Sequence, residues 1–263
     1  MKLPIFAPDD DPGPSFVGLW RKLNGPPPQL VGEGFTDTHG TTICALRYID
    51  GVVMAGDRRA TAGPTIAQRE VEKIHPADRW SGIGIAGSAG FGIEMIKLFQ
   101  TELEHYEKMG GRPLSIEGKA NFLAQMVRSH LPLAFQGFIV VPLFAGYDTR
   151  RRTGRIFSYD ATGGRYEESD FTADGSGGRD ARTTIKLGWR EDLSPDEAIE
   201  LAVQALYEAA DEDSATGGPD VVRGIYPTVA TITASGYAEV AEAEVAQRFA
   251  ALIERKSARG QVR

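Results

Sequence analysis

The residue with the most distinctive chemical potential in this sequence is a threonine at the start of an expected strand. Thr41 follows Gly40 and opens a run rich in β-branched residues. A hydroxyl is a weak nucleophile at neutral pH, but an N-terminal threonine carries its own base, because an α-amino group has a pKa of about 8. That chemistry requires cleavage of the bond between Gly40 and Thr41, so that residues 1–40 form a leader. The alternative is an ordinary threonine in a strand.

Two charged residues are placed where they could activate such a threonine. Asp57 follows the apolar run 51–56, and Lys73 stands in the middle of an expected strand over residues 69–75. A lysine buried in a sheet needs a carboxylate partner or loses its charge, and Asp57 is the nearest candidate. A buried ammonium group beside Thr41 would favour the deprotonated hydroxyl and lower the pKa of the amine. The alternative is a lysine on a sheet edge or a solvent-facing side.

Two glycine-rich stretches could bind a nucleotide or phosphate, or could only allow the backbone to approach its neighbours closely. The sequence GIGIAG at residues 82–87 fits the dinucleotide-binding pattern, which would make the chain a nicotinamide-dependent oxidoreductase. The pattern needs a preceding strand, whereas its own alternation predicts that it is the strand, and failure to bind such a nucleotide would exclude this function. The stretch GSGG at residues 175–178 lacks the lysine of a phosphate-binding loop. Both stretches indicate close backbone approach.

Composition narrows the classes of function. The chain has 263 residues, enough for one large or two small domains, and its 41% hydrophobic and 25% charged residues are typical of a globular protein. A net charge of −7 argues against a nucleic-acid partner. Cys44 is the only cysteine, which excludes an intrachain disulfide, and the four histidines have no metal-ligand spacing. We therefore expect neither a metal nor a cofactor.

The beginning of the chain differs from the rest. Residues 1–40 hold seven of the 15 prolines, which disfavours helices and the hydrogen-bonded ladders of β-sheets. An apolar patch within 16–23 could contact a partner. Three aspartates at 9–11 are unlike a signal peptide, and the longest apolar run, 138–145, is too short to cross a membrane. We expect a cytoplasmic protein that does not associate with membranes. The patch consists of Phe16, Val17, Leu19, Trp20 and Leu23.

After residue 40 the periodicity alternates between blocks of strands and pairs of helices. Hairpin-linked strands with paired helices favour an α+β fold of antiparallel sheets over a doubly wound parallel sheet. Strands are expected at 41–49, 51–56, 69–75, 82–86, 138–147, 155–159, 165–168, 219–223 and 227–233, and helices around 93–109 and at 115–130, 180–187, 194–210 and 238–254.

Six motifs in the same order over residues 40–245 resemble a β-type subunit of the proteasome core particle, most of all the actinobacterial type. The resemblance implies the fold of N-terminal nucleophile hydrolases, a four-layer αββα sandwich with two antiparallel sheets between helix layers. It also implies a propeptide over residues 1–40 and a catalytic domain over 41–263. The motifs are GTTI (40–43), GDRRAT (56–61) with Lys73, GIAGSAG (84–90), GYD (146–148), GSG (175–177) and DSATGG (213–218).

The resemblance also implies a threonine-type endopeptidase and a role for each matching residue. Thr41 would be the nucleophile, with its freed amine as the proton acceptor, and the Lys73–Asp57 pair would tune it. The N–H of Gly87 would supply the oxyanion hole. Three residues would hold the amine and a water molecule: Ser176, Asp213 and Thr216, the last in place of the serine of many relatives.

The resemblance also implies which residues bind the substrate. Thr61 and Ala89 would hydrogen-bond the substrate backbone as an added strand. The pocket for the residue before the cut would be small or apolar, which predicts a preference for apolar or aromatic residues. Its lining residues would be Ala60, Val71, Ile85, Ala89 and Ile93.

The resemblance implies an assembly as well. Members of the family form seven-membered rings, two of β subunits between two of α subunits, and an ATPase ring on the α ring delivers unfolded or tagged proteins. One alternative is the two-ring bacterial threonine peptidase, which has no α subunits. The long leader and the Asp57-Arg58-Arg59 run argue against this alternative. Another is a non-catalytic ring subunit, which the loss of Thr41, Asp57 or Lys73 would support, yet all three are present.

Overall fold

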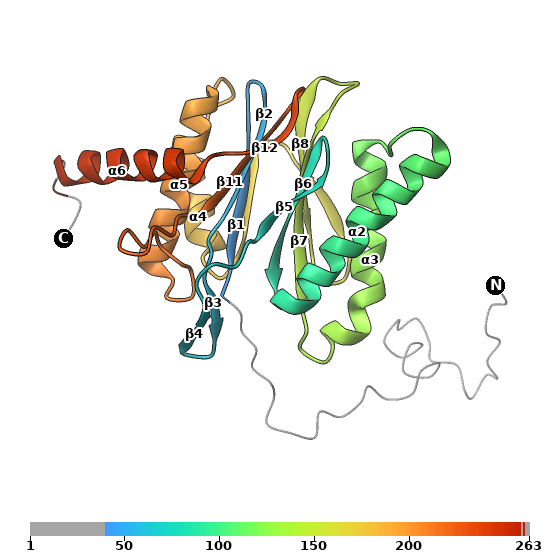
Figure 1. Cartoon of the computed structure of the whole chain (residues 1–263), viewed down its shortest axis with the longest axis horizontal. Helices are drawn as coiled ribbons and strands as arrows, with labels where there is room; N and C mark the ends of the chain where they lie inside the picture. Colours follow the sequence, from blue (N-terminus) through green and yellow to red (C-terminus); the bar gives the residue numbers. More distant parts are fainter. Residues whose placement is uncertain (1–39, 259, 261–263) are drawn as a thin grey trace, which may run out of the picture.

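The computed structural model describes residues 40–258 and 260 of the chain. Two antiparallel sheets pack face to face, and helices cover the outer side of each (Figure 1). The four-layer α+β architecture expected from the sequence is thereby confirmed. Residues 1–39, including the apolar patch within 16–23, lie outside the described residues.

The first sheet has five strands in the order β10-β1-β2-β11-β12. Its central strands β1 and β2 are buried almost throughout, which explains their continuous apolar character. The sheet places the start of β1 between β2 and β10, so that the residues just before β1 lie between two loops. The strands are β1 (Thr42–Tyr48), β2 (Gly51–Gly56), β10 (Phe171–Gly175), β11 (Thr228–Thr233) and β12 (Gly236–Glu239).

The second sheet has five strands in the order β5-β6-β7-β8-β9, and a separate two-stranded hairpin, β3-β4, projects beside the first. Residues 82–87 lie within β6, so the glycine pattern there forms a strand and does not follow one. The strands are β3 (Ala60–Ala62), β4 (Thr65–Gln68), β5 (Ile74–Asp78), β6 (Ser81–Gly87), β7 (Val140–Asp148), β8 (Thr153–Tyr159) and β9 (Arg165–Glu168).

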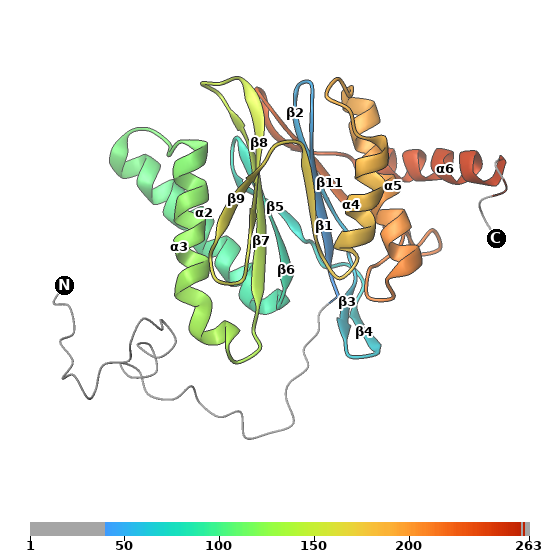
Figure 2. The same ribbon diagram turned by 180° about the vertical axis from the view of Figure 1, so that it is seen from behind.

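Each helix layer belongs to one sheet, as the view from behind also shows (Figure 2). Helices α2 and α3 pack on the second sheet, α4 and α5 on the first, and α6 packs on α5. The start of α5 follows its sequence signal, because Ser194 and Glu197 form a capping box and Pro195 occupies the first helical position between them. The helices are α2 (Ala89–Gly110), α3 (Ile116–Ala134), α4 (Gly178–Gly188), α5 (Pro195–Glu212) and α6 (Glu242–Ala258).

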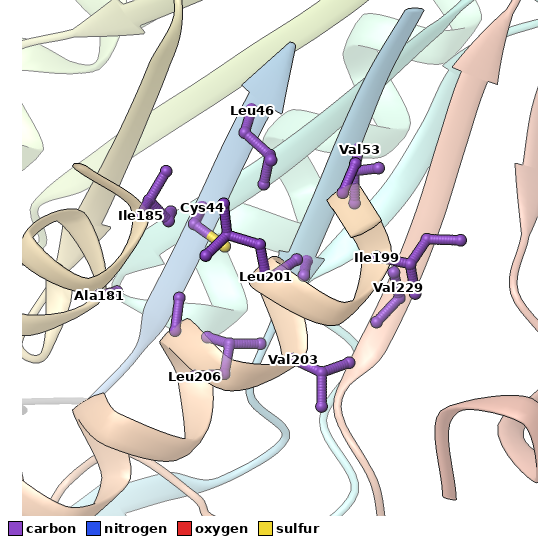
Figure 3. Packing of buried hydrophobic residues seen from close by; sticks show 14 of the residues in the cluster. Cys44, Leu46, Val53, Ala181, Ile185, Ile199, Leu201, Val203, Leu206 and Val229 are labelled. Atoms are coloured by element: carbon purple, nitrogen blue, oxygen red, sulfur yellow. The ribbon is translucent and has the colours of Figure 1, made fainter. Parts of the chain in front are cut away.

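Apolar residues form three buried clusters, one between the sheets and one under each helix layer. Figure 3 shows the cluster under α4 and α5, where Ile185 and Leu201 lie near Cys44 of β1. Burial raises the pKa of the Cys44 thiol to about 12, so it stays protonated at neutral pH. Among the described residues, none of the helices combines the length and the apolar character that a membrane crossing requires.

Three expected elements differ from the structure. The strand expected at 69–75 begins only at Ile74, because the preceding residues turn back toward the loop after β2. The strand expected at 219–223 is a turn closed by a bridge between Asp220 and Ile225. The last helix begins at Glu242 and not at 238, because β12 pairs with β11 first.

Candidate active site

Thr41 lies directly before β1, an inner strand of the first sheet, and is only 4% exposed. Its carbonyl oxygen accepts a 2.8 Å hydrogen bond from the N–H of Ser176, and its own N–H donates to Ser176 Oγ at 3.4 Å. Gly175 permits this contact, because its φ is +94° and a Cβ there would lie 1.9 Å from the Thr41 carbonyl oxygen. The loop after β10 therefore fixes the main chain of Thr41.

The ion pair expected between Lys73 and Asp57 is present and lies between the two sheets. Lys73 Nζ is 2.5 Å from Asp57 Oδ1, and both side chains are at least 95% buried. Asp57 follows β2 of the first sheet, whereas Lys73 precedes β5 of the second, so Lys73 does not stand inside a strand as expected. Its carbonyl oxygen still accepts a hydrogen bond from the N–H of Ile85, which holds the residue against β6.

Lys73 Nζ also reaches the peptide bond that precedes Thr41. It donates to the carbonyl oxygen of Gly40 at 3.2 Å and to that of Arg59 at 2.6 Å. Burial lowers the pKa of Lys73 below its ordinary value, while the negative charge of Asp57 opposes the shift. The ammonium group is thus close to the Gly40 carbonyl and easier to deprotonate than a lysine in water.

Asp57 is fixed by main-chain donors from three segments. Its Oδ1 accepts the N–H of Thr42 at 2.7 Å, and its Oδ2 accepts the N–H groups of Arg59 at 2.9 Å and Gly217 at 2.8 Å. A carboxylate with several such donors has its negative charge stabilised without exposure to water. The arrangement keeps the charge that faces Lys73 in one position.

The three residues expected to hold the amine and a water molecule form one hydrogen-bonded group. Ser176 Oγ donates to Asp213 Oδ2 at 2.5 Å, and Thr216 Oγ1 donates to the same oxygen at 2.6 Å. Burial raises the pKa of Asp213, but the two hydroxyl donors together with the N–H groups of Ala215 and Thr216 outweigh burial, and the pKa is lowered. Ser176 contacts Thr41, whereas the fully buried Thr216 contacts Thr42 Oγ1 at 2.6 Å.

A partly open pocket lies beside Thr41, which forms part of its wall. Its wall includes all five residues predicted for the substrate pocket, together with Gly87 and Lys73. Gly87 has a φ of +103°, and a Cβ there would lie 2.2 Å from the carbonyl oxygen of Ile139, so only glycine fits. The five predicted residues are Ala60, Val71, Ile85, Ala89 and Ile93.

Thr61 contacts Gly40, the residue before Thr41. The N–H of Gly40 donates to Thr61 Oγ1 at 3.0 Å, so the residue expected to bind a substrate backbone here binds the chain's own. A Cβ on Gly40 would lie 2.1 Å from the Cβ of Ala215. The residue before Thr41 is thus enclosed between β3 and the loop after α5.

Several residues of the site were not predicted. Thr42 joins β1 to Asp57 and Thr216, and its Oγ1 also accepts the N–H of Gly177 at 3.0 Å. The alternation of side chains along a strand could have identified Thr42, since it predicts that Thr42 faces the side opposite to Thr41. Glu72, His75 and Ile96 also line the pocket and carried no motif that would have identified them.

The geometry brings a hydroxyl-bearing residue, a buried lysine–aspartate pair and a peptide carbonyl to one place. A positive charge beside a hydroxyl favours its deprotonated form, and hydrogen-bond donors around a carbonyl stabilise the charge that develops on attack. The pocket offers apolar contacts next to this point. Acyl transfer to a threonine hydroxyl is the chemistry that fits this arrangement.

Comparison with known proteins shows the family of this chain. Residues 37–223 match the family model described as "Proteasome subunit". The chain is 57% identical over 248 residues to a proteasome subunit beta of Acidimicrobium ferrooxidans, with 93% of this chain and 91% of the relative covered. It is 56% identical over 218 residues to that of Streptomyces griseus (83% and 78% covered) and 53% over 244 residues to that of Acidothermus cellulolyticus (91% and 80%). The chain therefore belongs to the proteasome subunit family.

Proposed function

We propose that this chain is a proteolytic β subunit of a proteasome core particle whose nucleophile is Thr41. The observation that carries the proposal is the position of Lys73 Nζ, within 3.2 Å of the Gly40 carbonyl oxygen and 2.5 Å of Asp57 Oδ1. A structural ion pair would not need to contact the one peptide bond whose cleavage frees Thr41. The names of the similar actinobacterial proteins support the same function.

Cleavage of the leader follows from this geometry. Thr41 Oγ1 attacks the carbonyl carbon of Gly40, and the hydroxyl proton passes to a water molecule, while the Lys73 ammonium group donates to the Gly40 carbonyl oxygen. The C–N bond then breaks, the nitrogen takes up the proton, and residues 1–40 remain attached to Oγ1 as an ester. Water hydrolyses the ester, which releases the leader as a carboxylate and leaves a free amine on Thr41.

Substrate hydrolysis repeats the same acyl transfer on a foreign peptide. The freed amine of Thr41 accepts the hydroxyl proton, and Ser176 with Asp213 orients the amine, consistent with the contact of Ser176 to the Thr41 N–H. Thr216 holds Asp213 in place. The positive charge of Lys73 favours the deprotonated hydroxyl, and Asp57 keeps the lysine oriented.

The pocket beside Thr41 takes the substrate residue before the cut. Its apolar wall of Val71, Ile85 and Ile93 favours apolar or aromatic side chains. The N–H of Gly87 receives the negative oxygen of the tetrahedral intermediate, and donors of this kind are worth roughly 3–4 kcal/mol. Thr61 and Ala89 pair with the substrate backbone, in keeping with the bond between Gly40 and Thr61.

The remaining proposals concern maturation and assembly. Residues 1–40 are a propeptide and 41–263 the mature catalytic chain, which joins other β subunits and α subunits in seven-membered rings. An ATPase ring on the α ring supplies unfolded or tagged proteins in the cytoplasm. Enclosure in a chamber then restricts the peptidase to chains that are fed into it.

The intact mass and N-terminal sequence of the chain, co-expressed with its α subunit, test the proposal. We expect a mature chain that begins at Thr41, and a Thr41→Ala variant that keeps all 40 leader residues. A Ser129→Ala variant is the control, because Ser129 lies on the exposed side of α3. A wild-type chain that keeps residues 1–40 inside assembled particles would refute the proposal and leave a scaffold subunit.

A further inference from the structure

A second cavity, which Thr41 does not line, lies next to the segment that carries Asp57. Three of its lining residues are arginines: Arg58, Arg59 and Arg69. The carboxylate in its wall belongs to Asp220, which is already engaged 2.6 Å from Arg223 Nη1. The cavity therefore has an excess of positive charge.

The guanidinium groups are poorly neutralised. Arg58 Nε is buried without a hydrogen-bond partner among the described residues, and its nearest carboxylate, Glu242, is 3.5 Å away and 57% exposed. Arg59 Nη1 donates to the carbonyl oxygen of Ser214 at 2.9 Å. Within residues 40–258, neither Arg59 nor Arg69 forms an ion pair. Positive charges that line one cavity repel one another, and a bound anion would reduce this repulsion.

We propose that this cavity binds a small oxyanion, either a phosphate or a carboxylate. Guanidinium groups offer paired N–H donors that match both groups, and a partly enclosed cavity strengthens the attraction relative to bulk water. The main-chain turn at Gly217 and Gly218 forms part of the wall, so the anion also meets backbone. This site lies outside the nucleophile pocket and does not depend on the proposed peptidase activity.

The cavity is connected to the Asp57–Lys73 pair through main-chain atoms. The N–H of Arg59 donates to Asp57 Oδ2, and the carbonyl oxygen of Arg59 accepts from Lys73 Nζ. Gly217, also in the wall, donates its N–H to the same carboxylate oxygen. An anion that orders Arg59 and the turn at Gly217 would thereby order the groups that hold Asp57. It would also offset the charge of Arg59, which acts to lower the pKa of Lys73.

Calorimetric titration of inorganic phosphate into the full-length Thr41→Ala chain at low ionic strength tests this site, since no turnover is required. We expect one phosphate per chain. Arg69→Gln, a change at an exposed position, and Arg58→Gln should each weaken binding by about tenfold, the loss of one charge-assisted contact. The matched control is Arg190→Gln, an exposed arginine paired with Asp192 and Glu197, which should leave binding unchanged.

A second titration identifies the source of the oxyanion. An acetylated dipeptide with a free carboxylate is compared with its amide, and preference for the acid over the amide and over phosphate indicates a peptide terminus. Phosphate binding without binding of the dipeptide acid indicates a free phosphate. Equal affinity of the Thr41→Ala chain and of its Arg58→Gln and Arg69→Gln variants for both anions, or no heat from either anion, would overturn the proposal.

Discussion

Lys73 Nζ and Asp57 Oδ1 lie 2.5 Å apart and join a residue before β5 of one sheet to a residue after β2 of the other. Apolar packing elsewhere holds the two sheets together, so this ion pair is a polar contact in a mainly apolar interface. Burial of charge is costly unless every group is paired. The site therefore depends on the complete set of donors around Asp57.

The two members of this ion pair should differ in their contribution to stability. Asp57→Asn places an NH₂ group where Asp57 now accepts N–H donors, so it should reduce the free energy of unfolding by about 3–5 kcal/mol. Lys73→Met should cost less, because three N–H donors still stabilise Asp57. Urea unfolding of both variants measures the difference. Equal losses would show that the N–H donors around Asp57 contribute little.

Gly40→Ala should slow removal of the leader. A Cβ at this position would lie 2.1 Å from Ala215 Cβ and 2.5 Å from its carbonyl oxygen, so the Gly40 carbonyl must move away from Lys73. Ala215→Gly in the same chain should restore the rate only in part, because the main-chain contacts remain. Mass spectrometry after timed assembly follows both variants. Processing at the wild-type rate would contradict the close fit at Gly40.

The carboxylate of Asp213 should add stability in a defined pH range. Its pKa is below its ordinary value of 3.8, so its contribution is complete above that value and is lost as the pH falls through the lower native pKa. Asp213→Asn should therefore lower stability near pH 7 and approach the wild type in acid. Thermal unfolding of both chains from pH 7 to pH 3, in the Thr41→Ala background, provides the comparison. A constant difference at all pH values would exclude this role.

Thr216→Val should show whether the hydroxyl of Thr216, and not its methyl group, positions Asp213. The variant loses the bond to Asp213 and the contact with Thr42, with an expected cost of about 1–3 kcal/mol and a lower kcat at nearly constant KM. Thr216→Ser keeps the hydroxyl and should restore kcat. If the serine variant is as slow as the valine variant, the hydroxyl is not the group that positions Asp213.

Ala89→Leu should change the substrate preference by reducing the pocket beside Thr41. Ala89 lines this pocket, and the three carbons that leucine adds would occupy space that an aromatic substrate side chain needs. We expect kcat/KM to fall about tenfold or more for peptides with phenylalanine before the cut, and less for alanine. Matched fluorogenic peptides measure the ratio. An equal fall for both peptides would place the substrate side chain elsewhere.

The sequence predicts long and strongly patterned elements better than short polar ones. The buried strands β1, β2 and β6 and the capped helix α5 agree with their expected positions. The β3-β4 hairpin was missed because all four residues of β4 are exposed and carry no alternation. β10 was missed because its short polar sequence is a strand only through its pairing with β1.

The candidate site was predicted mainly through its motifs. Proximity of Lys73 to Asp57 follows from the need of a buried charge for a partner, although the placement of Lys73 inside a strand was wrong. The contact of Lys73 with the Gly40 carbonyl and the enclosure of Gly40 by Ala215 depend on loops that meet only in the folded chain. No local pattern encodes such distances.

The donors to Asp57 come from parts of the chain that are far apart in sequence. Gly217 contributes an N–H across 160 positions, and Lys73 approaches from a different sheet. Under the proposed mechanism, Thr41 cannot cut its own chain until both of these segments have docked. The leader would then keep a misfolded or truncated copy inactive. Only a copy in which both segments have folded into place would become a protease.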